Sequence, residues 1–238
     1  MTATDEAIIL AGGLGTRLRS VVSGVPKALA QVNGRPFVAY LLDALATQGF
    51  SRVILATGYL GEMVEAVLGD RWHDMHLVYS REPQPLGTGG AVVLAAQHVH
   101  GAACFVLNGD TYLHLDYTDF DSCAQQSNLP LAMALANVPE TTRYGAVEVD
   151  GDRVVGFAEK RRSGPGYINA GAYRIECNLV AGQPAGAALS FERDVLRPAA
   201  KRGGILAYTQ TRGFIDIGVP EDFARAQRLL GVGGATAC

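Results

Sequence analysis

The sequence predicts an α/β protein in which helices cover a mainly parallel, buried sheet. Short apolar runs alternate with segments of helical periodicity in the first half of the chain, which is typical of parallel sheets. A glycine-rich segment directly follows the first apolar run, as ligand-binding loops follow strands in such sheets. The length of 238 residues is ample for one such domain and short for two.

In the first half, each predicted strand is an apolar run bounded by polar residues or glycine, and the predicted helices lie between the strands. The strands are Ala7–Ala11, Arg52–Thr57, Leu77–Tyr79 and Ala103–Leu107, and Leu131–Ala136 continues the series. The helices are Phe37–Thr47, Gly61–Leu68 and Gly87–His98. Because ligands bind beyond the carboxyl ends of the strands in open α/β sheets, we expect the site at that edge.

The second half has a different pattern. Tyr144–Val149 and Arg153–Phe157 are joined by a turn signal, so we expect a hairpin that adds a small antiparallel layer over the ligand. The other predicted elements are the strand Ile168–Ile175 and the helices Phe191–Lys201 and Pro220–Leu230. We expect residues 1–230 to form a single domain and Gly231–Cys238 to be a flexible tail.

The composition excludes several classes of protein. The net charge of −3 does not suggest a nucleic-acid-binding surface, and no apolar run is long enough to span a membrane. The polar, acidic N-terminus does not resemble a signal peptide, so we expect a cytoplasmic protein. The cysteines and histidines have no zinc-ligand spacing. The sequence is compatible with a homodimer but does not specify one.

The segment after the first predicted strand reads LAGGLGTRLRSVVSGVPKAL and predicts a phosphate-binding loop. Its glycines allow backbone N–H groups to approach an anion closely. Arg17 adds a fork of donors and Lys27 a compact positive charge, which together suit a nucleoside triphosphate. Leu18 breaks the dinucleotide fingerprint GxGxxG, and the P-loop motif has no match. A glycine-rich surface turn with incidental cations is the alternative.

Two aspartates at the ends of apolar runs are candidate metal ligands. Asp110 follows a predicted strand in the motif NGDT, and Asp216 ends the run in FIDIGVP. Mg²⁺ prefers one or two carboxylates together with phosphate oxygens and water. Each aspartate could instead be a turn or helix-capping residue.

The glycines, Thr16-Arg17 and Pro26-Lys27 resemble the signature GGxGTRLxPxTxxxPKPL of the sugar-1-phosphate nucleotidylyltransferases. The resemblance covers nearly the whole chain, although Arg19-Ser20 lack the usual proline and Ala28 replaces another. It implies a Rossmann-like sheet of the nucleotide-diphospho-sugar transferase type. It further implies catalytic roles for Arg17 and Lys27, and Mg²⁺ held by Asp110 and Asp216.

The resemblance also implies a nucleotide site on the glycine loop, on the segment that reads the base, and on the NGDT motif. The implied residues are Leu10, Ala11, Gly12, Gly13, Gly15, Thr16, Arg17, Glu82, Pro85, Gly87, Thr88, Asn108 and Gly109. Glu82 lies where thymidylyl and uridylyl branches often have glutamine. A carboxylate can accept from the adjacent N1–H and N2–H₂ donors of guanine, whereas the carbonyls of uracil and thymine would repel it. This favours GTP, unless Glu82 is paired with Arg81 or another neighbour.

The sugar 1-phosphate pocket implied by the resemblance comes from the second half. Its residues are Tyr144, Gly145, Glu159, Lys160, Asn169 and Gly171, with the Gly145 amide facing a sugar hydroxyl and Lys160 holding the phosphate. The segment that contains Glu159 and Lys160 resembles the EKP motif of the family, with Arg161 in place of proline, and could otherwise be a solvated charged loop.

Within the family, the chain is similar to guanylyltransferases that act on D-glycero-α-D-manno-heptose 1-phosphate. The expected reaction is GTP plus this sugar phosphate giving GDP-heptose and pyrophosphate, for bacterial surface polysaccharides such as capsule. Mannose 1-phosphate with GTP and N-acetylmuramate 1-phosphate with UTP are the alternatives. A non-catalytic sugar-nucleotide sensor would be favoured by loss of Lys27, Asp110 or Asp216, and all three are present.

Overall fold

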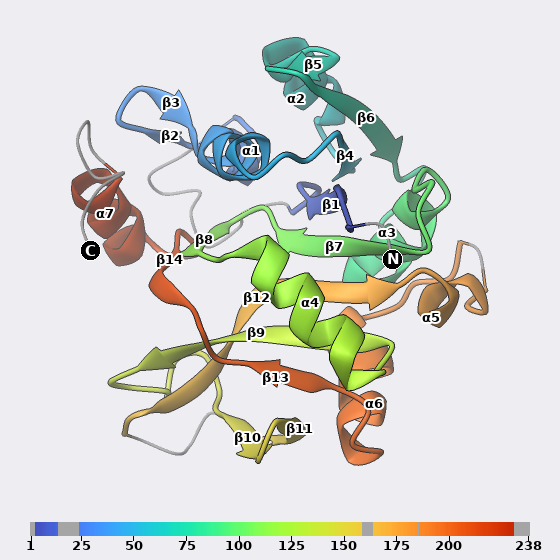
Figure 1. Ribbon diagram of the computed structural model, residues 1–238. Coiled ribbons are helices and arrows are strands. Elements are labelled where there is room, and N and C mark those ends of the chain that lie inside the picture. The colour runs from blue at the N-terminus through green and yellow to red at the C-terminus, as the bar shows by residue number, and fades with distance from the viewer. Residues whose placement is uncertain (1–2, 14–23, 159–163, 185, 231–238) are drawn as a thin grey trace.

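The computed structural model describes residues 3–13, 24–158, 164–184 and 186–230 (Figure 1). Within these residues, ten strands form one mixed sheet in the order β10-β11-β13-β9-β12-β7-β1-β4-β6-β5. Helices cover both faces of this sheet, so the predicted α/β class is confirmed.

The parallel half of the sheet comes from the first half of the chain. Its strands are β1 (Glu6–Leu10), β4 (Arg52–Thr57), β6 (Met75–Arg81) and β7 (Ala103–Asn108). β1 pairs in parallel with both β4 and β7, and β4 pairs in parallel with β6. The interiors of β1, β4 and β7 are buried, as their continuous apolar sequences predict.

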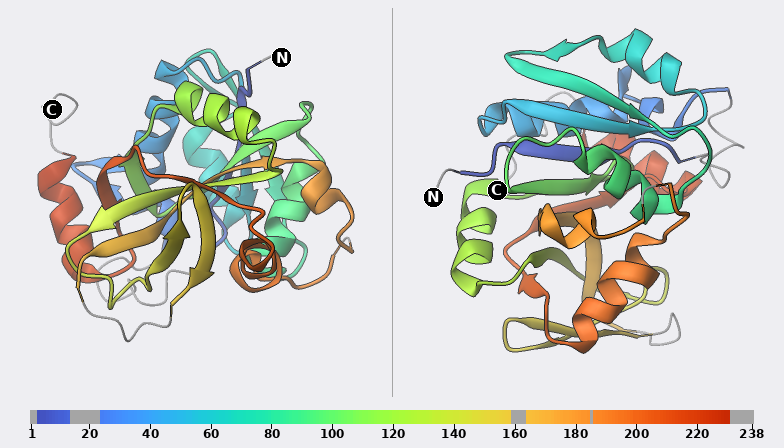
Figure 2. Two further views of the ribbon diagram at one scale, coloured as in Figure 1. Left: turned by 60° about the horizontal axis from the view of Figure 1, so that its bottom comes forward. Right: turned by 90° about the vertical axis from the view of Figure 1, so that its right-hand side faces the viewer.

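The side chains of β1 alternate between two cores. Ala7 and Ile9 pack with residues of α1 (Phe37–Thr47), α2 (Gly61–Leu68) and α4 (Tyr117–Ser127). Ile8 faces the opposite way and packs with α3 (Gly87–Ala96), α5 (Asn178–Ala181) and α6 (Arg197–Lys201). The left view of Figure 2 shows α4 and α6 on opposite sides of the sheet. The predicted limits of α1 and α2 are confirmed, and α3 ends two residues earlier than predicted.

The second half of the chain extends the same sheet. β12 (Gly166–Glu176) runs antiparallel between β7 and β9 (Leu131–Val138), so β9 is not a direct neighbour of β7. β13 (Leu206–Tyr208) pairs in parallel with β9. The predicted hairpin is present as β10 (Val147–Asp150) and β11 (Arg153–Phe157), and β11 pairs with β13. The predicted antiparallel hairpin is therefore confirmed, and it is continuous with the main sheet, of which it forms one edge.

Two short antiparallel pairs lie outside the main sheet. β8 (Thr111–His114) pairs with β14 (Arg212–Asp216), and this pairing brings Asp216 opposite Thr111, beside Asp110. β2 (Gln31–Val32) pairs with β3 (Arg35–Pro36), and α7 (Pro220–Leu229) packs beside them (Figure 1). The remaining elements are a 3-10 turn at Lys27–Leu29, β5 (Arg71–Trp72) and a π-helical turn at Phe191–Leu196 that begins the predicted helix Phe191–Lys201.

Helix α4 was not predicted, because its sequence YTDFDSCAQQS is mostly polar. Its first turn is capped by Asp116, whose carboxylate accepts from the Asp119 amide at 2.9 Å. A buried ion pair holds it to β12, with Arg174 Nε 3.1 Å from Asp121 Oδ1. The predicted C-terminal tail, residues 231–238, lies outside the described residues. No helix in the described part of the chain is both long and apolar enough to cross a membrane.

Candidate active site

A cavity of about 320 Å³ lies at the carboxyl ends of the parallel strands. All ten described residues of the predicted nucleotide site line it, together with Lys27 and Asp110. The ten are Leu10, Ala11, Gly12, Gly13, Glu82, Pro85, Gly87, Thr88, Asn108 and Gly109. Gly15, Thr16 and Arg17 lie outside the described residues. Ala28, Ala56 and Ala91 also line the cavity and were not predicted; their small side chains leave room for a ligand.

The ends of β1 and β7 approach each other closely at the floor of the cavity. The Gly109 amide donates to the Leu10 carbonyl at 3.1 Å, and a Cβ at Gly109 would lie 2.6 Å from that oxygen. On the other side of β1, the Ala11 amide donates to the Ala56 carbonyl at 2.8 Å. Because no side chain fits at Gly109, the backbone that leads to Asp110 is held directly against the glycine loop.

Glu82 follows β6 and lines the same cavity. In the sheet, β1 and β4 lie between β6 and β7, so Glu82 and Asp110 are at opposite ends of the cavity edge. Glu82 Oε2 accepts from the Leu86 amide at 2.9 Å, and a Cβ at Gly12 would lie 3.5 Å from Glu82 Oε1. Burial raises the pKa of the Glu82 carboxyl, and the Leu86 amide opposes this shift. Arg81 pairs with Glu62 and Glu65, on the exposed side of α2.

The start of α3 forms another wall of the cavity and is fixed to the chain before the π-helical turn. The Gly89 amide donates to the Leu189 carbonyl at 2.8 Å, and the Phe191 amide donates to the Thr88 hydroxyl at 3.0 Å. A Cβ at Gly87 would lie 2.6 Å from the same Leu189 oxygen. These contacts set the position of the segment between Glu82 and α3.

Lys27, Asp110 and Asp216 converge beside the cavity. The Lys27 ammonium is in contact with Asp110 Oδ2, and the Lys27 side chain is 13% exposed. A Cβ at Gly218 would lie 2.8 Å from Asp216 Oδ1 and 3.3 Å from Lys27 Nζ. The Ile217 amide donates to the Asp110 carbonyl at 3.0 Å, so the chain after β14 is tied to the end of β7.

Burial, and then the negative charge of Asp110, raise the pKa of the Asp216 carboxyl, while Lys27 opposes the shift. Two carboxylates close enough to repel each other form a natural site for a cation, and Mg²⁺ prefers such oxygen ligands. Within the described residues, no group of three or more His, Cys, Asp or Glu side chains could hold a metal. A metal held here would have Asp110 and Asp216 as its protein ligands and would take the others from phosphate and water.

The described residues of the predicted sugar pocket come from β12 and from the chain before β10. Asn169 donates through Nδ2 to the Tyr173 hydroxyl at 2.7 Å and accepts from the Gly171 amide at 3.0 Å. Gly171 has a φ of +74°, and a Cβ there would lie 2.5 Å from the Asn108 side-chain nitrogen. The predicted sugar segment on β12 therefore adjoins the predicted nucleotide site at Asn108.

The other part of the predicted sugar pocket is the turn at Tyr144 and Gly145. The Gly145 amide already donates to the Thr141 carbonyl at 2.9 Å, so the predicted bond from this amide to a sugar hydroxyl competes with the turn. The Tyr144 hydroxyl donates to Asp222 Oδ2 at 3.2 Å. Glu159 and Lys160 lie outside the described residues.

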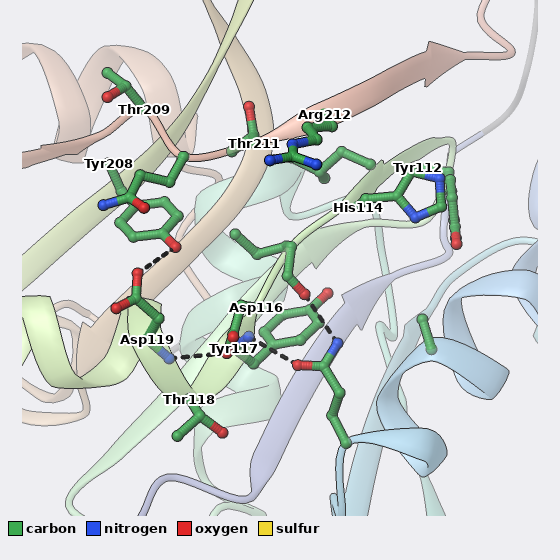
Figure 3. A pocket seen from close by; sticks show the side chains of 15 residues that line it. Tyr112, His114, Asp116, Tyr117, Thr118, Asp119, Tyr208, Thr209, Thr211 and Arg212 are labelled. Atoms are coloured by element: carbon green, nitrogen blue, oxygen red, sulfur yellow. Dashed lines mark hydrogen bonds between the residues drawn. The ribbon is translucent and has the colours of Figure 1, made fainter. Parts of the chain in front are cut away.

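A second, more open hollow of about 1000 Å³ lies between α1, α4 and the connection from β13 to β14 (Figure 3). Some of its polar side chains bond to neighbouring protein groups: the Tyr208 hydroxyl donates to Asp119 at 2.7 Å, and Gln48 bridges the Leu115 carbonyl and the Tyr117 amide. Of the predicted site residues that the structure describes, none lines this hollow. Most of them line the smaller cavity instead.

The parallel strands of this α/β sheet end at glycines, a mostly buried lysine and one carboxylate, and the short β8–β14 pair brings a second carboxylate beside them. These are features of a nucleotide-dependent transferase. The chain belongs to the nucleotidyl transferase family, which residues 6–231 match.

Two curated proteins and one solved structure illustrate the similarity. The chain is 38% identical to the D-glycero-alpha-D-manno-heptose 1-phosphate guanylyltransferase of Aneurinibacillus thermoaerophilus, over 94% of this chain and 98% of that protein. It is 35% identical to the mannose-1-phosphate guanylyltransferase of Mycobacterium tuberculosis, over 92% of this chain and 63% of that protein. The crystal structure of HddC from Yersinia pseudotuberculosis complexed with GMP-PN covers 95% of this chain and 100% of its own, with a TM-score of 0.84 and 35% identity.

Proposed function

We propose that this enzyme transfers GMP from GTP to D-glycero-α-D-manno-heptose 1-phosphate and releases pyrophosphate. The observation that carries the proposal is the placement of Glu82 and the Lys27–Asp110 pair on one cavity. In the strand order β7-β1-β4-β6, Asp110 and Glu82 follow the two outer strands. Three strand spacings separate those ends by about 14 Å, which suits a nucleotide with its base at Glu82 and its phosphates at Lys27.

The base assignment rests on the Glu82 carboxylate. The Leu86 amide occupies one of its oxygens, and each carboxylate oxygen has two lone pairs, so both oxygens can still accept from guanine. The guanylyltransferases similar to this chain and the GMP-PN complex of HddC support GTP as the donor.

The proposed reaction is an in-line displacement at the α-phosphorus. An oxygen of the sugar phosphate attacks, and pyrophosphate leaves as its bond to phosphorus breaks. No general base is needed, because a phosphate monoester is mainly a dianion above a pKa of about 6. Lys27 stabilises the negative charge that grows on the α-phosphate. The close contact between the Gly109 backbone and the Leu10 carbonyl holds Asp110 in place. Mg²⁺ bound by Asp110 and Asp216 would neutralise triphosphate charge.

Mannose 1-phosphate is the second candidate acceptor, because a mannose-1-phosphate guanylyltransferase is 35% identical to this chain. We also propose that the product serves the synthesis of surface polysaccharides and that the reaction takes place in the cytoplasm, without a nucleic-acid or membrane partner.

The function is tested by measuring pyrophosphate release with Mg²⁺ for four nucleoside triphosphates and three sugar 1-phosphates: mannose, glucose and D-glycero-D-manno-heptose. Turnover with GTP and the heptose phosphate is the expected result. Turnover with GTP and mannose 1-phosphate alone would replace the acceptor, and turnover confined to UTP or dTTP would refute the base assignment.

Changing Glu82 to Gln is expected to lower the ratio of kcat/KM for GTP to kcat/KM for UTP by about ten- to a hundredfold. A bidentate base contact is worth roughly 1–3 kcal/mol, and each 1.4 kcal/mol is a factor of ten. The glutamine oxygen can still accept from the Leu86 amide, so the loop is expected to stay in place. The exposed Glu62→Gln on α2 is the matched control. An unchanged ratio in Glu82→Gln would refute base reading by this carboxylate.

A further inference from the structure

Asp222, at the start of α7, is a buried carboxylate that faces two arginines and one tyrosine hydroxyl. Its side chain is 8% exposed. It is in contact with the Arg143 guanidinium, accepts from the Tyr144 hydroxyl at 3.2 Å and lies 3.7 Å from Arg225 Nη1. One buried carboxylate therefore holds two guanidinium groups, and the cluster has an excess of one positive charge.

The two arginines differ in what else they contact. Arg225 donates to the Phe214 carbonyl at 3.1 Å and so serves the attachment of α7 to β14. The Arg143 guanidinium lies 5.1 Å from the centre of the Tyr144 ring, and its side chain remains 39% exposed. A guanidinium has five N–H donors, so Arg143 has donors available for an anion after its contact with Asp222. The excess positive charge is thus presented to solvent at Arg143.

Arg143 is also connected to the candidate active site through the aromatic ring on which it stacks. The Tyr144 ring packs edge-to-face on Phe214, 5.5 Å between centres, and Phe214 belongs to the strand that ends at Asp216. Phe214 and Asp216 lie two residues apart on β14, so their side chains share one face of that strand. The guanidinium therefore stacks on the predicted sugar residue Tyr144, whose ring packs on the strand that carries the second carboxylate of the site.

We propose that Arg143 binds the phosphate of the sugar 1-phosphate and that Asp222 is the positioning residue that holds its guanidinium. This inference rests on the proposed transfer to a sugar 1-phosphate. The planar fork of an arginine matches two phosphate oxygens, and stacking on Tyr144 together with the Asp222 contact limits the rotamers that the side chain would lose on binding. A dianionic acceptor must approach the negatively charged triphosphate, and a cation fixed on the acceptor side reduces that repulsion.

The test compares Arg143→Met, Arg143→Lys and Asp222→Asn with the wild-type enzyme, measuring KM separately for GTP and for the sugar 1-phosphate. Arg143→Met is expected to raise KM for the sugar 1-phosphate about tenfold or more and to leave KM for GTP within twofold. Arg143→Lys should recover part of the loss. Arg212→Met, which removes an exposed arginine from the same strand as Phe214, is the matched control and should change neither KM.

Asp222→Asn separates a positioning role from a purely structural one. If Asp222 acts through Arg143, the double variant Arg143→Met/Asp222→Asn should have the same KM for the sugar 1-phosphate as Arg143→Met alone. An additive effect, or equal increases in both KM values together with a lower melting temperature, would overturn the positioning role.

In one outcome, the wild-type enzyme uses a sugar 1-phosphate while Arg143→Met leaves KM for that substrate unchanged. This result would overturn the inference about Arg143 and leave the proposed function in place. An increase confined to KM for GTP would reassign Arg143 to the nucleotide and overturn it as well. A wild-type enzyme that uses no sugar 1-phosphate would overturn the proposed function, and the inference with it.

Discussion

Changing Lys27 to Met is expected to reduce kcat by about 10²- to 10³-fold, the usual effect of losing one donor to a charge that develops in the transition state. The Lys27 side chain is only 13% exposed and contacts Asp110, so its ammonium is preorganised in the cavity. The 3-10 turn that carries it is anchored by Ala28 and Leu29, both buried, which keeps the backbone in place in the variant. Binding of the sugar-nucleotide product should be largely retained.

This expectation is checked by steady-state turnover alongside calorimetric titration with GDP-sugar. Lys201→Met, which removes the same charge from the exposed end of α6, is the control and should keep wild-type turnover. Near-normal kcat in Lys27→Met would remove the lysine from the catalytic machinery, whereas a loss of product binding would make it a binding residue.

The first half of the fold could be predicted because local pattern and tertiary structure agree there. Phe37–Thr47 and Gly61–Leu68 have helical periodicity and become α1 and α2 with the predicted limits. Continuous apolar runs become buried parallel strands, since both faces of such strands are covered. The glycine loop and Asp110 could be predicted at one edge of the sheet because each follows a parallel strand. The other cavity residues that were predicted came from the resemblance to the family.

The second half depends on pairings between distant segments, which local pattern does not encode. β12 inserts between β7 and β9 and joins the hairpin β10–β11 to the main sheet through β9 and β13. Helix α4 is mostly polar, and its place is set by Asp121 and Arg174, which are far apart in the sequence. Asp222 and Arg143 were missed likewise, because each looks like an ordinary exposed charge until α7 packs beside Tyr144.

Changing Asp110 to Asn is expected to reduce kcat by about 10³-fold or more, because several kcal/mol of metal-derived charge stabilisation depend on this carboxylate. The asparagine keeps the size of the side chain, and the backbone bond from the Ile217 amide to the Asp110 carbonyl does not involve the side chain. Turnover measured against Mg²⁺ concentration should show a higher half-saturating concentration as well as a lower maximum. Asp70→Asn, at an exposed position after α2, is the control.

The Lys27–Asp110 contact makes the double variant more informative than either single one. Residues in direct contact are expected to have non-additive effects. In Asp110→Asn the Lys27 ammonium loses its carboxylate partner, so part of the lost activity reflects a misplaced lysine and not the metal alone. We therefore expect Lys27→Met/Asp110→Asn to lose less activity than the product of the two single losses. Strict additivity would mean that the two groups act independently, and an Asp110→Asn variant with more than a tenth of wild-type kcat would exclude Asp110 as a metal ligand.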